Sequence, residues 1–357
     1  MKGIAKLASE LGISTGTVSR ALNGKSDVNA ATRARVLEAA QRMGYAPNAS
    51  ARNLAKGATN SIGFMIELNP ETASNSDNFF MGVFDGVQSV LMQHGLELLV
   101  LPCPTDADPY HYLQRFVARE TVDAMIISAT QRIDHRIDLL QARGIPFVSL
   151  GRSESGAGYS WIDLDVEGVV NESIDRLVAH GHRRIAVTVP RRGINFAELF
   201  HASYRSALAR HGLPYDPALV IDTAWSELGG YEMTDRLFAV PDRPTAVVLI
   251  YEMMALGLYR RLMELGIQPG RDLAVITFRD EPALRFLSPS ATCFRMSLHD
   301  LGVAVAEAVL AQLPGHRTSP AAPVVQMRWP MVLRPGESDA FTLPPQTSRR
   351  QVKPRSA

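Results

Sequence analysis

The chain has 357 residues, of which 46% are hydrophobic and 20% charged, and its formal net charge is +1. This composition is typical of a globular protein of two or three domains and excludes a disordered or fibrous chain. No stretch reaches the roughly 18 apolar residues of a membrane helix, and residues 1–25 have charges but no apolar run of a signal peptide. Cys103 and Cys293 lie far apart and match no metal-ligand spacing. We therefore expect a cytoplasmic protein without a membrane partner.

Charge is distributed unevenly along the chain. Residues 1–60 contain nine lysines and arginines against three acidic residues, whereas the rest of the chain is mildly acidic. A basic module attached to an acidic body fits a protein that binds phosphate groups with its first part only. Small domains are often basic by chance, so this observation supports a nucleic-acid function without establishing one.

Residues 4–23 have the pattern of two short helices joined by a tight turn. Gly12 is placed to end the first helix, and Ser14 is placed to cap the second. This pattern fits a helix-turn-helix, whose second helix enters a DNA major groove. It fits an ordinary helical hairpin about as well. The apolar positions are Ile4, Leu7, Ala8 and Leu11 in the first helix and Val18 and Leu22 in the second.

The stretch that follows favours the DNA-binding interpretation. Asn29 is placed to cap a third helix with apolar Val36, Leu37, Ala40 and Met43, closed by Gly44. Four segments follow one another in a characteristic order and spacing: TVSRALNG, TRARVLEAAQRMGY, PN and ARNLAKGATNSIGF. In these segments the sequence resembles the lactose-repressor/galactose-repressor (LacI/GalR) family of bacterial transcription regulators, and the resemblance continues to about Pro335.

The resemblance implies a regulator, most often a repressor, that binds a pseudo-palindromic DNA operator as a homodimer. It also implies a hinge helix that becomes ordered when two copies pair on DNA, and a leucine, here Leu54, that wedges between bases in the minor groove. Arg20 is the one long donor on the recognition helix; it could pair with guanine, and the alternative is that it contacts phosphate only. The expected DNA-binding residues are Ser14, Thr15, Gly16, Thr17, Ser19, Arg20, Asn23, Thr32, Asn48, Arg52 and Leu54.

From residue 61 onward, buried strand-like runs alternate with amphipathic helical segments. Near-continuous apolar strands separated by helices predict parallel sheets buried on both faces. The expected strands are 61–68, 96–101, 122–127, 146–150, 184–189, 245–250 and 273–278. The expected helices are 78–94, 109–119, 134–143, 165–180, 196–211, 229–239 and 252–265.

The fold class expected is α/β: an N-terminal all-α helix-turn-helix head and a periplasmic-binding-protein-like body of two doubly wound parallel-sheet lobes. The two lobes of the body, with three chain crossings near residues 161–164, 290–294 and 320–325, are implied by the resemblance. The expected domains are the head at 1–46, a hinge and linker at 47–60, the body at 61–335 and a disordered tail at 336–357. Within the body, lobe one takes 61–162 and 293–322, and lobe two takes 163–291 and 323–335.

Two other classes of protein use the same sheets. An α/β enzyme is one, but the chain has no dinucleotide-binding glycine motif, Walker loop, nucleophile elbow or zinc-protease motif. A solute-binding protein is the other, and it has neither a DNA-binding head nor a place in the cytoplasm. We expect a regulator that is not an enzyme and uses no cofactor and no metal ion.

A small-molecule effector is implied by the resemblance, at a site between the lobes where parallel strands end. The matching positions are Phe79, Phe80, Arg152, Phe196, Phe200, Trp225, Tyr251, Glu252, Arg279 and Asp280. For each aromatic residue taken singly, packing in the core is the simpler interpretation. Trp225 matches best, because a tryptophan often stacks on a sugar ring in this family.

Several positions depart from the family pattern for sugars. Phe200 stands at a frequent arginine, and Gly151 and Arg279 stand at frequent aspartates. Arg152 and Arg279 would suit phosphate or carboxylate oxygens, so the sequence favours an anionic effector, a sugar phosphate or organic acid, over a neutral sugar. In the alternative, Arg279 pairs with neighbouring carboxylates, namely Asp280, Glu281 or Glu252.

Overall fold

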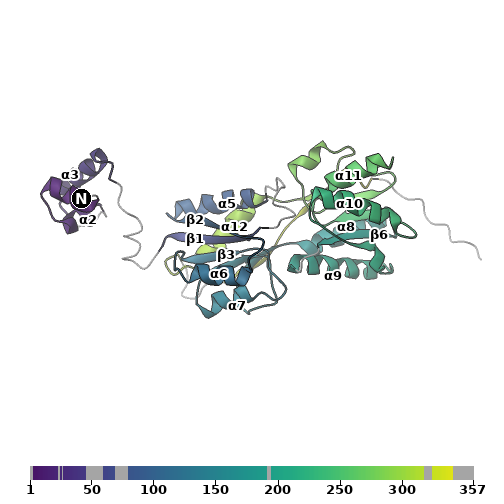
Figure 1. Ribbon diagram of the computed structural model, residues 1–357, viewed down its shortest axis with the longest axis horizontal. Coiled ribbons are helices and arrows are strands. Elements are labelled where there is room, and N and C mark those ends of the chain that lie inside the picture. The colour runs from purple at the N-terminus through teal and green to yellow at the C-terminus, as the bar shows by residue number, and fades with distance from the viewer. Residues whose placement is uncertain are drawn as a thin grey trace, which may run out of the picture. The chain divides into compact units, whose positions relative to one another are not determined.

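Three short helices form the N-terminal unit of the computed structural model, which divides into a head, Met1–Thr59, and a body, Asn60–Ala357 (Figure 1). The structure describes residues 3–22, 25, 27–45, 59–68, 79–190, 194–316 and 324–340. Helices α1 (Ile4–Leu11), α2 (Thr15–Leu22) and α3 (Ala30–Arg42) surround a small apolar core. Of the apolar positions named in the third helix, Val36 and Ala40 are buried in this core, whereas the side chain of Leu37 is 49% exposed.

The first lobe of the body is built on a six-stranded parallel sheet in the order β11-β5-β4-β3-β1-β2. Helices form the crossovers from β1 to β2, β2 to β3 and β3 to β4, whereas β4 and β5 are joined by a loop without a helix. The strands are β1 (Ser61–Glu67), β2 (Glu97–Cys103), β3 (Ala124–Ile127), β4 (Phe147–Leu150), β5 (Ser160–Leu164) and β11 (Gln326–Trp329).

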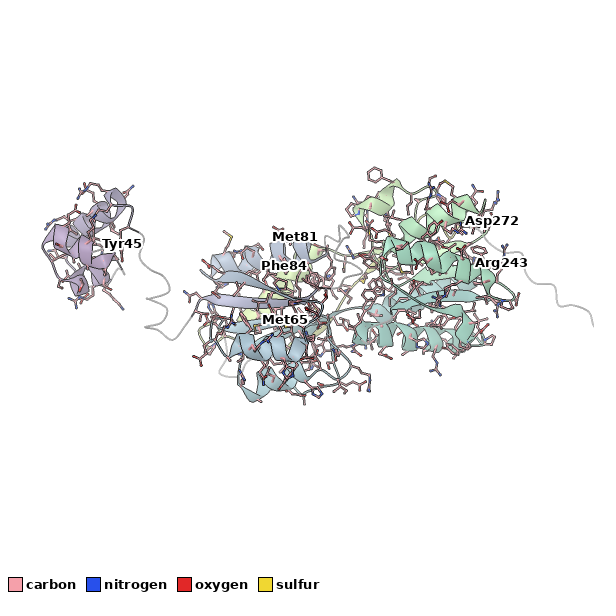
Figure 2. All side chains as sticks on the ribbon, in the orientation of Figure 1. Tyr45, Met65, Met81, Phe84, Arg243 and Asp272 are labelled. Atoms are coloured by element: carbon pink, nitrogen blue, oxygen red, sulfur yellow. The ribbon has the colours of Figure 1, made fainter. Side chains whose placement is uncertain are left out.

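Helices cover both faces of this sheet, because its strands bury apolar side chains on both sides. Helices α5 (Phe79–Gln93) and α12 (Leu298–Leu310) cover one face, and α6 (Pro109–Val117) and α7 (His135–Ala142) cover the other (Figure 1). Phe84 lies on the α5 side and Met65 on the α6 and α7 side (Figure 2).

The second lobe contains a four-stranded parallel sheet in the order β7-β6-β8-β9. Helices α8 and α9 pack together, as do α10 and α11, and their apolar faces join the strands in one core. The strands are β6 (Ile185–Pro190), β7 (Val220–Thr223), β8 (Ala246–Leu249) and β9 (Ala274–Thr277). The helices are α8 (Val166–Ala179), α9 (Asn195–Arg210), α10 (Glu227–Ala239) and α11 (Met254–Glu264), with short 3-10 turns at Pro217–Leu219 and Pro282–Phe286.

The chain passes between the lobes three times, as predicted. It passes from β5 into α8, from β10 (Cys293–Arg295) into α12, and from β11 into β12 (Val332–Arg334). Strands β10 and β12 pair with each other in an antiparallel ribbon that packs on lobe two. The third crossing therefore follows Trp329, and its predicted place at 320–325 is wrong because β11 still belongs to the sheet of lobe one.

The predicted disordered tail starts too early in the sequence. Ser338 and Asp339 are completely buried, and the Val275 amide donates a hydrogen bond to the Ser338 carbonyl at 2.8 Å. Arg176 forms an ion pair with Asp339. Polar anchors hold residues 336–340 without any apolar periodicity, which is why the sequence pattern did not reveal them. The remainder of the expected tail, 341–357, lies outside the described residues.

No helix among the described residues is long and apolar enough to cross a membrane. Both cysteines are free and buried, as expected for idle thiols. Burial raises the pKa of Cys103 above its ordinary value and that of Cys293 to about 11. Both thiols are therefore held in the protonated, unreactive form at neutral pH.

Glycines allow the paired helices of each lobe to approach closely. A methyl group added at Gly302 of α12 would lie 2.1 Å from the Val83 carbonyl oxygen of α5, and one at Gly257 of α11 would lie 1.7 Å from the Glu227 carbonyl oxygen. Such contacts are impossible without moving one backbone away from the other. Helix α12, which the sequence pattern did not predict, completes one face of lobe one.

We expect Gly302→Ala to lower the free energy of unfolding of the body by about 1–3 kcal/mol, the usual cost of overpacking. Urea denaturation followed by circular dichroism measures this change. The control is Gly315→Ala, because a methyl group there meets no atom within 4 Å. Equal stability of the two variants would contradict the close approach of α5 and α12.

Candidate DNA-binding surface and effector cleft

The turn between α1 and α2 is fixed by the residues that the sequence singled out. Gly12 adopts a left-handed conformation with φ of 67°, and its amide donates to the Ala8 carbonyl. The Ser14 hydroxyl accepts the Thr17 amide at 3.1 Å and lies 2.9 Å from the Thr17 hydroxyl. The predicted glycine stop and serine cap are both confirmed, and Val18 is buried against α1 and α3.

The outer face of α2 is small, polar and accessible. Ser14, Thr15, Gly16 and Arg20 are exposed, while Thr17 and Ser19 are half-buried. Such short side chains allow a helix backbone to approach DNA closely, and hydroxyl groups can bind phosphates. The Arg20 Nε lies 3.6 Å from the Asp27 carboxylate, and more than half of each side chain is exposed. Such a surface pair is weak, so Arg20 remains available to another partner.

The remaining predicted DNA contacts are only partly described. Thr32 is half-buried in the first turn of α3, where the Asn29 side chain accepts the Ala31 amide at 2.8 Å. Free amides at a helix start suit phosphate oxygens. Asn23, Asn48, Arg52 and Leu54 lie outside the described residues, so their roles stay predictions.

In the body, most of the predicted effector residues follow the carboxyl ends of parallel strands, where ligands bind in open α/β sheets. An aromatic cluster lies at the ends of β6, β7, β8 and β9 in lobe two. Trp225 stacks on Tyr251 with ring centroids 6.0 Å apart, and its edge meets Phe196 at 5.7 Å. Trp225 and Phe196 are only partly buried, so they offer apolar ring surface next to a polar wall.

That wall contains Arg279, whose side chain is almost completely buried. Its guanidinium group forms ion pairs with Glu252 and with Glu281, the latter at 3.1 Å. The guanidinium carbon lies 5.5 Å from the ring centroid of Phe79, the first residue of α5, and this cation–π contact joins the two lobes. Two carboxylates already share the charge of Arg279, which agrees with the alternative of local pairing, and a contact of Arg279 with an anionic ligand stays a prediction.

Arg152 is held in the same way on the other side of the cleft. Its Nε lies 3.2 Å from Asp163 of β5, and its Nη2 forms an ion pair with Glu167 in the first turn of α8. Burial raises the pKa of Asp163 to about 6, although the positive charge of Arg152 acts against this rise. Arg328, which is half exposed, approaches Glu167 at 3.4 Å.

Asn195 links the two lobes by hydrogen bonds, although the sequence did not single it out. Its amide donates to the Thr130 carbonyl at 2.9 Å, and its side-chain amide donates to the Arg152 carbonyl at 2.7 Å. Both contacts connect lobe two to lobe one. The signals in the sequence were its place next to Phe196 and its position at the start of a helix that follows a strand.

Three predicted effector residues have other roles in this structure. Phe200 is completely buried in the core of lobe two, and Phe80 packs against Phe64 and Phe84 in lobe one. Asp280 binds Arg334 at 3.1 Å, and Arg285 and Arg295 both at 3.3 Å, so it holds the β10–β12 ribbon in place. Each had matched the family only by its position in the sequence. Among the described residues there is no group of three or more side chains able to hold a metal ion.

Comparison with known proteins agrees with this architecture. A family model described as bacterial regulatory proteins, lacI family, matches residues 1–48, and one described as a periplasmic binding protein-like domain matches residues 174–338. The HTH-type transcriptional regulator AglR of Rhizobium meliloti (strain 1021) is 34% identical over 313 residues, which cover 86% of each chain.

Two solved structures are also similar. The complex of the transcriptional regulator CelR with cellobiose superposes with a TM-score of 0.70 at 25% identity, covering 95% of this chain and 100% of that one. The lac repressor dimer bound to operator and the anti-inducer ONPF gives a TM-score of 0.79 at 23% identity, covering 93% of this chain and 97% of that one.

A helix-turn-helix head joined to a two-lobed binding-protein body defines a DNA-binding transcription regulator controlled by a small effector. With a relative of 34% identity along most of both chains, this chain belongs to the LacI family of bacterial transcription regulators. It is a regulator and not an enzyme, and its α/β body with an N-terminal helix-turn-helix confirms the predicted fold class.

The raised pKa of Asp163 predicts a pH dependence of stability. A carboxyl group with a higher pKa in the folded than in the unfolded state binds protons on folding, so stability falls as pH rises from about 4 to about 6. Asp163→Asn removes this effect. We expect the stability of this variant relative to wild type to increase by about 1 kcal/mol between about pH 5 and pH 7. Urea denaturation at both pH values measures it, and a constant difference would contradict the raised pKa.

Proposed function

We propose that the protein is a cytoplasmic repressor that binds a pseudo-palindromic operator as a homodimer and is controlled by a neutral carbohydrate. The observation that carries the choice of effector is that Arg152 and Arg279 are each shared by two carboxylates. An added anion would meet this negative charge in a poorly solvated site. A hydroxylated neutral ring meets fixed acceptors and donors instead.

The aromatic cluster supports the same choice. Trp225 and Phe196 offer partly exposed ring faces beside the polar wall, and ligand sites typically combine such apolar surface with a few placed polar groups. A regulator similar along 95% of this chain was solved in complex with cellobiose, which supports a neutral sugar as the class of effector for this chain too.

For the effector, we expect differential scanning fluorimetry of the full chain to show a higher melting temperature with one or more neutral di- or trisaccharides, because a ligand that binds only the folded state stabilises it. Glucose 6-phosphate and citrate should produce no shift. Trp225→Ala should weaken binding of the active sugar at least about tenfold, measured by calorimetry. Tight binding of the anions and none of the sugars would refute a neutral effector.

For DNA, we propose that Arg20 pairs with a guanine in each half-site, with the neighbouring small residues of α2 on the phosphates. Arg20→Ala should then remove about 1–3 kcal/mol of discrimination between operator and mismatched DNA, measured by fluorescence anisotropy. The control is Arg35→Ala, which removes an equal charge from the exposed face of α3. If Arg20→Ala weakens all DNA sequences equally, Arg20 contacts phosphate only.

A further inference from the structure

A cavity opens on the side of α6. It has a volume of about 290 Å³ and lies where β1 and β2 end, in contact with the residue that precedes α9. None of the effector positions expected from the sequence lines it. Its walls are formed by Glu67, Leu68, Cys103, Pro104, Thr105, Ala107, Pro109, Gln131 and Ile194.

The polar floor of this cavity is held rigidly in place. Glu67, the last residue of β1, accepts from Arg136 Nη1 at 2.8 Å. Arg136 is only 2% exposed, is bound at a second position by Asp134, and donates to the Ser128 carbonyl at 3.0 Å. Although burial opposes it, the hydrogen bonds from Arg136 hold the pKa of Asp134 below its usual value. The Glu67 carboxylate is thus held in position by Arg136.

Both lobes contribute to the cavity, next to the aromatic cluster. Gln131 of lobe one and Ile194 of lobe two form a backbone bridge at its wall. The next residue along the chain, Asn195, binds the Arg152 carbonyl at 2.7 Å, and Phe196 after it meets Trp225. Ile194 at the wall of the cavity is therefore only two residues before Phe196, which contacts Trp225.

The size and chemistry of the cavity suit one more ring. Sites for drug-sized ligands have volumes of roughly 300–1,000 Å³, so this cavity is at the small end of the range. The Glu67 carboxylate can accept hydrogen bonds from sugar hydroxyl groups, and the side chains of Gln131 and Thr105 can both donate and accept hydrogen bonds. Pro104, Pro109 and Ile194 provide apolar surface for the C–H face of a ring.

We propose that this cavity is an additional sugar subsite, which binds the outer ring of an oligosaccharide whose other rings occupy the cleft at Trp225. This inference rests on the proposed control by a neutral carbohydrate. Because the walls come from both lobes, an outer ring bound here would contact both lobes and favour one arrangement of them over others.

The test is calorimetry of the full chain with sugars that differ by one ring: cellobiose and cellotriose, maltose and maltotriose, and melibiose and raffinose. We expect the longer member of the active pair to bind about tenfold more tightly than the shorter one. Ala107→Phe, which fills the cavity, should abolish this gain and leave the affinity for the shorter sugar unchanged. The control is Ala118→Phe, the same exchange at an exposed residue beyond the C-terminus of α6.

A second variant keeps the test decisive if Ala107→Phe fails to fold. Gln131→Leu keeps the side-chain volume but removes the amide, and it too should reduce the gain from the extra ring, whereas Gln114→Leu on α6 should not. Equal affinity of both sugars of the active pair, or an undiminished gain in both cavity variants, would overturn the subsite alone. Failure of all six sugars to bind would overturn the neutral effector and the subsite together.

Discussion

The sharing of each cleft arginine by two carboxylates is the interaction on which the site depends. Burial of a guanidinium group costs several kcal/mol, and a single carboxylate does not reliably repay this cost. Arg136 and Arg279 are 2% and 5% exposed, and each is held between two acidic partners. Arg152 follows the same arrangement with Asp163 and Glu167. The result is a set of fixed polar groups with no uncompensated positive charge, which suits hydroxyl groups better than anions.

These ion pairs also reach the crossings between the lobes. Glu167 begins α8 just after the first crossing and contacts Arg152 of the cleft and Arg328 of β11, shortly before the third. Asp280 binds Arg295 before the second crossing and Arg334 after the third. A ligand that moves Arg152 would therefore change ion pairs beside the crossings between the lobes. Such a coupling needs a difference in ligand affinity between two lobe arrangements, and residues that contact both lobes provide it.

Local sequence signals predicted most of this architecture. Apolar runs identified the main strands, and Gly12, Ser14 and Asn29 marked helix ends correctly, because caps and turns depend on residues close in sequence. The partners of the effector positions were harder to predict. Arg279 pairs with Glu281, two residues away, and with Glu252, 27 residues away, and the sequence left these pairs open as an alternative to a ligand. The sequence could not decide between them, because Glu252 and the Asp280 partners Arg295 and Arg334 lie in other segments of the chain.

One strand connects the cleft to the linker of the DNA-binding head. The amide of Asn60, just before β1, donates to the Asp123 carboxylate at 2.6 Å, and Glu67 at the other end of β1 is bound by Arg136. Strand β1 pairs with β3 on one side and with β2 on the other. Pairing on both sides keeps β1 in register with its neighbours. Asn60 and Glu67 are therefore two anchored ends of one strand, and the residues before Asn60 lead to the head.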